Sequence, residues 1–265
     1  MRETLEALAA GELSVAAAQA ELAGYAENDG GRFDAARQSR AGVPEAILGD
    51  GKTPDEVATL AGTAVETTGQ AIATRVDAEQ VVAIRRQLAD EAPDASVRWD
   101  ERSNVVVVQG PDFEPPRLDA SVGVVTAGTS DAVPAGEAVA IAGAMGARIS
   151  RVDDVGVASI ARLLDRLEVL RDLDVLVVAA GREGALPTVV AGLVDVPVIG
   201  LPVSTGYGHG GEGEAALSGM LQSCTALSVV NVDSGFTAGA QAGLIARRLD
   251  AARGNAGSGP TVHGT

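Results

Sequence analysis

The chain has 265 residues and a formal net charge of −16 at pH 7. This length provides enough apolar surface for a sizeable core in one large domain or two small ones. A surface this acidic repels the phosphates of nucleic acids, so a nucleic-acid partner is not expected. Hydrophobic residues make up 46% of the chain and aromatic residues only 2%, so the core must consist of Ala, Val, Leu and Ile.

The single cysteine excludes an intramolecular disulfide. Charges stand at the start of the chain, where a secretory signal would need an apolar region. No apolar run is long enough to span a bilayer. We therefore expect a cytoplasmic protein with no membrane partner.

The N-terminal segment, residues 1–41, predicts helices followed by a linker. Leucines recur at helical spacing over residues 1–29, and Ser14 is a suitable N-cap for a second helix. Residues 30–41 are polar and carry three arginines, a composition typical of a linker.

Residues 42–119 predict a small α/β domain. Its expected elements are a strand (43–50), a helix (51–69), a strand (70–76), a second helix (77–92) and a β-hairpin (96–110). Thr53 is a suitable N-cap for the first helix, with Pro54 at the first helical position and Glu56 placed to complete a capping box. Prolines then indicate the end of the domain.

Residues 120–253 alternate apolar strands with helices. The expected strands are 121–129, 147–152, 174–181, 196–203 and 227–233, and the expected helices include 131–146, 158–172, 186–193 and 238–253. Runs of Val and Ile separated by helices are typical of a parallel sheet covered on both faces. The expected fold class is therefore α/β, a three-layer αβα domain with a parallel sheet, preceded by the small α/β domain and the helical segment. The Gly/Ser/Pro-rich tail, residues 254–265, is expected to be disordered.

Polar side chains follow the first strand of this domain. In open parallel sheets, ligands bind at the carboxyl ends of the strands. Here the strand leads into Ala127-Gly128-Thr129-Ser130-Asp131, where backbone amides and hydroxyls are suited to holding a phosphate. Ser130 or Asp131 can equally be a simple helix N-cap.

The third strand leads into a glycine-flanked turn, Gly181-Arg182-Glu183-Gly184. An arginine and a glutamate at this place are candidates for substrate contact and for acid–base chemistry. A solvent-facing ion pair of little energetic weight is an equal alternative.

The fourth strand leads into a glycine-rich loop, residues 204–213, with Ser204, Tyr207 and His209 as candidate substrate contacts. Such a loop is either a lid over a ligand or a surface crossing. The sequence has two histidines, so a divalent metal must be bound mainly by oxygen, which favours Mg²⁺. Asp233, at the end of the last strand, either binds that metal or caps the following helix.

Cys224 lies near the end of the helix that precedes the fifth strand. A lone cysteine is more often a small buried apolar residue than a nucleophile. Its neighbours Gln222, Ser223 and Thr225 are polar, so the alternative that Cys224 is a reactive thiol stays open. A thiolate needs a nearby positive charge, and a pyridinium substrate would itself supply one.

Four stretches, taken in order, resemble the LarB family, the carboxylating enzymes that begin nickel-pincer nucleotide synthesis. They are AGTSD (127–131), DVGVA (154–158), GREGALPTVVAGLVDVPVIGLPVSTGYG (181–208), and LQSC with VVNVDSGF (221–236). The C-terminal half is also similar to PurE-type carboxyaminoimidazole ribonucleotide mutase. In the N-terminal half, DAARQSRAGVPEAILGDGKTPDEV resembles the corresponding part of the LarB family.

The resemblance implies an enzyme that carboxylates C5 of the pyridinium ring of nicotinic acid adenine dinucleotide, with CO₂ or bicarbonate as co-substrate. The same enzyme would cleave the phosphoanhydride and release AMP. The resemblance implies that Cys224 adds to C6 of the ring, which makes C5 nucleophilic. Glu183 would act in acid–base chemistry, while Ser130 and Asp131 would hold phosphate or ribose. Mg²⁺ would assist the phosphoanhydride cleavage, and the expected assembly is a homo-oligomer, an octamer.

The sequence departs from the family pattern at Ala161, where relatives carry a histidine, and His209 is a candidate replacement. Two alternatives therefore stay open. One is the mutase itself, against which stand the missing histidine, the extra N-terminal domain and Cys224. The other is a nucleotide-binding module that has lost catalysis.

Overall fold

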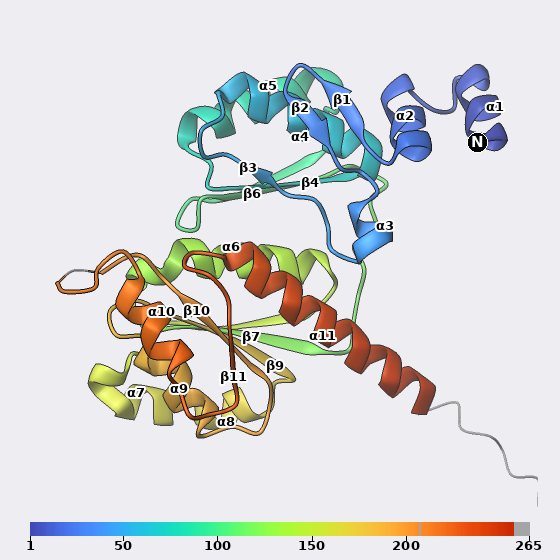
Figure 1. Cartoon of the computed structure of the whole chain (residues 1–265). Coiled ribbons are helices and arrows are strands. Elements are labelled where there is room, and N and C mark those ends of the chain that lie inside the picture. Colours follow the sequence, from blue (N-terminus) through green and yellow to red (C-terminus); the bar gives the residue numbers. More distant parts are fainter. Residues whose placement is uncertain (207, 257–265) are drawn as a thin grey trace, which may run out of the picture. The chain divides into compact units, whose positions relative to one another are not determined.

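A computed structural model describes residues 1–206 and 208–256 of the chain. The chain divides into two compact units, Met1–Pro115 and Pro116–Thr265. Each unit is built around its own hydrophobic core, and each is described here by itself (Figure 1).

The first unit begins with two short helices, α1 (Arg2–Ala10) and α2 (Val15–Ala23). The predicted cap is confirmed, because the Ser14 hydroxyl accepts a hydrogen bond from the N–H of Ala17 at 3.0 Å. The predicted linker over residues 30–41 is wrong. The helical prediction for residues 1–29 also fails at its end, where β1 (Ala26–Asn28) forms a hairpin with β2 (Gly31–Phe33). Helix α3 (Arg37–Ala41) follows the hairpin, and Phe33 anchors the hairpin in the core.

A four-stranded sheet forms the centre of the first unit, with strand order β3-β4-β6-β5. Its strands are β3 (Ile47–Leu48), β4 (Gln70–Thr74), β5 (Ser96–Asp100) and β6 (Val105–Gln109), and its helices are α4 (Pro54–Thr68) and α5 (Ala78–Glu91). The predicted hairpin of β5 and β6 is confirmed. So is the capping box of α4, in which the Thr53 hydroxyl accepts the Glu56 N–H and the Glu56 carboxylate accepts the Thr53 N–H.

The second unit contains a five-stranded sheet in which every pair of neighbouring strands is parallel. The strands are β7 (Ser121–Thr126), β8 (Arg148–Val152), β9 (Val175–Ala180), β10 (Val198–Pro202) and β11 (Leu227–Val229). Their order is β11-β10-β9-β7-β8. After β7 the chain adds β8 on one side and then returns to add β9 on the other, so the strand order reverses between β7 and β9.

Helices cover both faces of this sheet, which confirms the expected three-layer αβα fold (Figure 1). Helices α6 (Ala132–Ala144) and α11 (Gly235–Ala256) lie on one face, and α7 (Ile160–Leu164), α8 (Leu167–Arg171), α9 (Ala185–Ala191) and α10 (Glu214–Leu221) lie on the other. Alternate residues of each strand belong to different core clusters. Val177 and Ala179 of β9 pack on the α6 side, while Leu176 and Val178 pack on the opposite side.

Two details of the second unit differ from the sequence prediction. The single helix expected over 158–172 is interrupted, because α7 and α8 are separate helices. Of its leucines, Leu163 and Leu170 are fully buried, whereas Leu164 is 48% exposed. Helix α11 continues to Ala256, so the expected disordered tail begins inside a helix, and its remainder, 257–265, lies outside the described residues.

Helices α6 and α11 approach each other closely through glycines of α11. A Cβ added at Gly235 would lie 2.0 Å from the carbonyl oxygen of Pro134, and one at Gly239 would lie 2.6 Å from that of Ala138. Both separations are shorter than a van der Waals contact, so only glycine permits this spacing.

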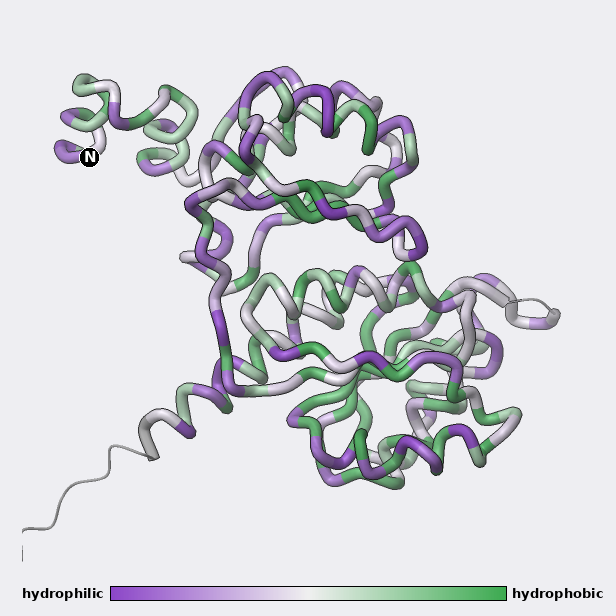
Figure 2. Tube along the Cα trace, turned by 180° about the vertical axis from the view of Figure 1, so that it is seen from behind, coloured by the Kyte–Doolittle hydropathy of each residue, from purple (hydrophilic) through white to green (hydrophobic). Residues whose placement is uncertain are grey.

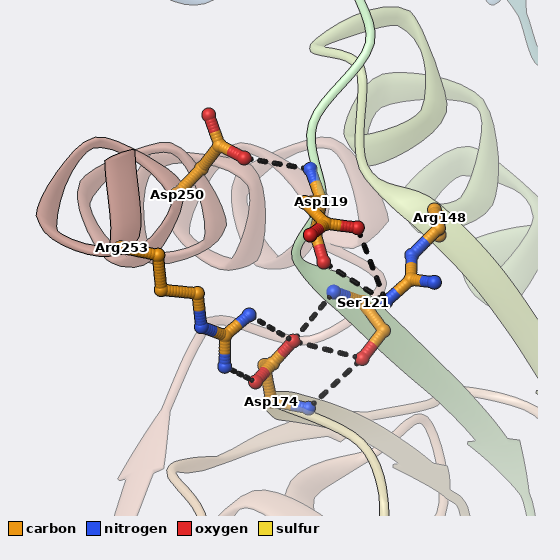
Figure 3. Close-up of polar contacts among 6 residues, drawn as sticks. All are labelled: Asp119, Ser121, Arg148, Asp174, Asp250 and Arg253. Carbon is orange, nitrogen blue, oxygen red and sulfur yellow. Dashed lines mark hydrogen bonds and ion pairs between the residues drawn. The ribbon is translucent and has the colours of Figure 1, made fainter. Parts of the chain in front are cut away.

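The far end of α11 is fastened to the sheet by an ionic cluster (Figure 3). The carboxylate of Asp174 accepts hydrogen bonds from the N–H and hydroxyl of Ser121, at 2.8 and 3.0 Å, and from the guanidinium of Arg253. These partners lower the pKa of Asp174 to about 2, the hydrogen bond from Arg253 being the main cause. Asp250, one turn earlier, accepts the N–H of Asp119 at 2.6 Å. The last turns of α11 alternate hydrophilic and less polar residues (purple and pale in Figure 2), so the polar cluster adds to the apolar contacts that Ile245 and Leu249 make with the core.

No helix within residues 1–206 or 208–256 combines the length and the apolar character needed to cross a membrane.

Candidate active site

A cleft of about 520 Å³ opens at the carboxyl edge of the parallel sheet. Its walls come from the segments that follow β7, β8, β9 and β10: Ala127, Gly128, Ser130, Asp131, Gly156, Val157, Ala158, Ala180, Gly181, Arg182, Glu183, Ala185, Leu186 and Thr205. The cleft therefore lies where the strand order reverses between β7 and β9. This is the position at which open α/β sheets bind their ligands.

The loop after β7 forms one wall of the cleft through Gly128, Ser130 and Asp131. Asp131 is 2% exposed, and its carboxylate accepts the N–H of Gly128 at 2.8 Å. Burial raises the pKa of Asp131 above its ordinary value, while the hydrogen bonds from Gly128 and Ser130 partly oppose this shift. Asp131 thus stabilises the loop that contains it. Thr129 belongs to the short 3₁₀ turn Thr129–Asp131 and does not line the cleft.

The turn after β9 forms the opposite wall. A Cβ at Gly181 would lie 2.3 Å from the carbonyl oxygen of Thr205, and one at Gly184 would lie 2.5 Å from that of Ala216. Glycine is therefore required at both ends of the turn. Between them Arg182 adopts a left-handed backbone with φ of 53°, and both Arg182 and Glu183 are exposed at the cleft.

A second cavity, of about 270 Å³, adjoins the cleft and shares Arg182 and Glu183 with it. Its other walls come from the glycine-rich loop after β10 and the start of α10: Gly206, Gly208, His209, Gly210, Gly211, Gly213 and Ala215. His209 thus lines a cavity together with Arg182 and Glu183, the two charged residues that also line the cleft. Tyr207, the remaining candidate in this loop, lies outside the described residues.

The loop after β10 is held in place by its neighbours on both sides. The Ser204 N–H donates to the carboxylate of Asp233 at 2.9 Å, and the Thr205 hydroxyl donates to the carbonyl oxygen of Ser130 at 3.2 Å. Thr205, which the sequence did not single out, lines the cleft, whereas Ser204 does not. Asp233 has a left-handed backbone with φ of 54°, and its carboxylate binds this loop through the Ser204 N–H.

Within the described part of the chain, no three His, Cys, Asp or Glu side chains come together in a way that could hold a metal ion. The residues present thus do not fit a metal site made by protein ligands alone. Asp233 in particular directs a carboxylate oxygen to the N–H of Ser204.

Cys224 is exposed and does not line the cleft. It follows α10 and precedes β11, whose first residue, Leu227, pairs with Val198 at the start of β10. Helix α10 packs on the turn that carries Glu183, since a Cβ at Gly219 would lie 2.4 Å from the Glu183 carbonyl oxygen. Cys224 follows Gly219 by five residues, and its place in the catalytic site stays a prediction.

Ala161, the residue that replaces a histidine of the resembled family, is exposed on α7 and does not line the cleft. Its neighbour Arg162 forms an ion pair with Asp154 at 2.7 Å.

Comparison with known proteins supplies the family. Residues 25–110 match the model of the LarB/PurE-like N-terminal domain, and residues 121–256 match the model of AIR carboxylase. The chain belongs to the LarB family. The chain is also similar to the uncharacterized protein MJ0165 of Methanocaldococcus jannaschii, with 38% identity over 224 residues, which are 82% of this chain and 84% of the relative. The two matches support a carboxylase-type function, and the cleft lies in the domain that matches AIR carboxylase.

Proposed function

We propose that the chain carboxylates C5 of the pyridinium ring of nicotinic acid adenine dinucleotide and hydrolyses its phosphoanhydride. The products are pyridinium-3,5-biscarboxylic acid mononucleotide and AMP. The observation that carries the proposal is the pair of adjoining cavities that share Arg182 and Glu183. A dinucleotide is a ligand of two halves joined by a diphosphate, and such a ligand needs two neighbouring pockets with a cation between them.

The cleft binds the nicotinate half in this proposal. The backbone and hydroxyls of the loop after β7 hold its phosphate or ribose, and Arg182 pairs with the diphosphate at the junction of the two cavities. The AMP half occupies the glycine-rich cavity, where His209 contacts it.

Carboxylation proceeds by nucleophilic catalysis. A cysteine thiolate adds to C6 of the pyridinium ring, and the electron pair of the C–N double bond moves to the ring nitrogen, which loses its positive charge. The resulting enamine attacks CO₂ through C5. Glu183 then accepts the proton from C5, the C–S bond breaks, and the aromatic ring is restored with the thiolate released. Water attacks the phosphoanhydride and gives AMP and the carboxylated mononucleotide.

The thiolate in this scheme comes from a second copy of the chain. Cys224 is exposed and does not line the cleft that Glu183 lines, which leaves its thiol accessible to the cleft of another copy. A homo-oligomer, with an octamer as the expected form, brings the exposed Cys224 of one copy to the cleft of another. Mg²⁺ enters the proposal only as a counter-ion of the substrate's diphosphate, and no step depends on it.

The test is mass spectrometry of the reaction with nicotinic acid adenine dinucleotide, Mg²⁺ and ¹³C-bicarbonate. The expected result is a labelled dicarboxylated mononucleotide together with AMP. Turnover of carboxyaminoimidazole ribonucleotide instead would assign the mutase reaction. Binding of the dinucleotide without turnover would assign a nucleotide-binding module.

Mixing two inactive variants tests the shared site. Cys224→Ala and Glu183→Gln should each abolish carboxylation. In a mixed oligomer one class of site regains both intact groups, so random mixing should restore about a quarter of the wild-type rate. Failure of the mixture to recover activity, with subunit exchange demonstrated, would reject the second-copy thiol.

A further inference from the structure

A buried carboxylate below the active site has no part in the chemistry above. Glu137, on α6, is 1% exposed. Asp131 and Glu137 are the two acidic side chains in the buried set of the described residues, Asp131 just before α6 and Glu137 in its second turn. Burying a carboxylate is unfavourable unless hydrogen bonds and positive potential compensate for the lost water.

The compensation comes from the start of α11. The Glu137 carboxylate accepts the N–H of Phe236, in the first turn of α11, at 3.3 Å. The N-terminus of a long helix carries partial positive charge, which favours a carboxylate at this place. Gly235 lets the two helices come together, since a Cβ there would lie 2.8 Å from the Glu137 Cβ.

The turn that Glu137 holds is the one that organises the cleft. Asp233 precedes α11, donates its N–H to the carbonyl oxygen of Pro202 at 2.9 Å, and accepts the N–H of Ser204. The next residue, Thr205, lines the cleft and bonds to Ser130. The contacts thus form a ring that runs from α6 through α11, the Asp233 turn and the loop after β10, and returns to the loop that begins α6.

We propose that Glu137 is a positioning residue for the active site, which closes this ring by fixing the start of α11 and thereby the place of Thr205 and Ser130 in the cleft. The kinetic part of this inference rests on the proposed function. The structural part does not, because it concerns contacts among the residues of this chain.

The experiment compares Glu137→Gln and Glu137→Leu with the wild-type protein, and uses Glu168→Leu, at an exposed position on α8, as a matched control. Glu137→Leu removes the acceptor and should raise KM for nicotinic acid adenine dinucleotide by about tenfold, with kcat changed less. Glu137→Gln keeps an oxygen acceptor and should restore most of the loss. A role in stability alone would reduce the amount of folded enzyme and leave KM unchanged.

Amide hydrogen exchange of the same folded variants gives a second readout that needs no substrate. In Glu137→Leu the segments 203–206 and 231–236 should exchange about tenfold faster, while β9 is unchanged. If Glu137→Leu does not fold, Glu137→Gln carries the test, with a smaller rise in exchange expected at the same segments. Unchanged exchange there, or an effect spread evenly over the second unit, would overturn the inference. Absence of turnover by the wild-type protein would count against the proposed function alone.

Discussion

The cluster of Asp174 and Arg253 makes a quantitative prediction about stability and pH. Replacing Arg253 by Ala removes the main cause of the low pKa of Asp174, which is about 2 in the folded protein against an ordinary value of 3.8. A shift of this size corresponds to at most about 2.5 kcal/mol of stability. Because the Arg253 side chain is 50% exposed, solvent screening reduces the expected loss to about 1 kcal/mol.

The pH dependence follows from the sign of the shift. A carboxyl group whose pKa is lowered by folding stabilises the protein above its unfolded pKa, and this contribution is lost as pH falls through its folded pKa. The difference between wild type and Arg253→Ala should therefore be constant above about pH 5 and should shrink between about pH 4 and pH 2. High salt should also reduce it, since one partner is half exposed.

Urea unfolding followed by circular dichroism at several pH values measures this difference. Arg248→Ala is the matched control, because Arg248 is an exposed arginine on the same helix with no ion pair to any residue in the described ranges. That variant should change stability by less than about 0.5 kcal/mol. A loss for Arg253→Ala that stays the same from pH 7 down to pH 3 would refute the electrostatic account and assign the effect to packing of the side chain.

Four further predictions concern single residues. Gly235→Ala should destabilise the second unit by about 3 kcal/mol or more in urea unfolding, since its Cβ would overlap the Pro134 carbonyl. Gly254→Ala is the control: a Cβ there has nothing within 4 Å, so this variant should be neutral or stabilising in the same assay. Thr53→Ala should cost about 1 kcal/mol through loss of the capping box, and an unchanged midpoint would contradict this. Asp131→Asn should not destabilise the protein at pH 7. Burial raises the Asp131 pKa, so ionisation of this carboxyl makes the wild-type protein less stable as pH rises through that pKa, and the neutral amide avoids this loss. A variant that is less stable than wild type by the same amount at pH 4 and at pH 7 would contradict this reasoning. Cys224→Ala should unfold within about 0.5 kcal/mol of wild type, because the side chain is exposed.

Local signals in the sequence predicted the elements that local physics determines. Thr53, Pro54 and Glu56 specify the start of α4 through backbone groups that lie within one turn, so the structure reproduces the prediction. The Val-rich strands of the second unit are equally recognisable, since both faces of a parallel sheet are buried. The parallel αβα architecture followed from that pattern alone.

Features that depend on tertiary contacts were missed. The hairpin that contains Phe33 has strands of three residues each, too short for an alternating pattern to appear in a polar segment. The break between α7 and α8 is marked by neither glycine nor proline, so leucine spacing predicted one helix. Leu164 is 48% exposed, so the buried face of this segment is narrower than the leucine spacing predicted.

The candidate site was predicted in part. The loops with Asp131 and Glu183 meet in one cleft because carboxyl ends of neighbouring parallel strands share an edge. Glu137 had a signal that was not used, since it is the one charged residue in the apolar helix α6.

The nucleophilic role proposed for the exposed Cys224 would make the protein sensitive to oxidants. A thiol reactive enough to attack a pyridinium ring is also open to peroxide, which converts it to a sulfenic acid. The chain has no other cysteine, so this acid cannot be trapped as an intrachain disulfide. A thiol from outside the chain, such as glutathione or the cysteine of another copy, is then needed to return it to the reduced form before irreversible oxidation. If Cys224 is the nucleophile, peroxide stress would remove the activity and leave the fold intact.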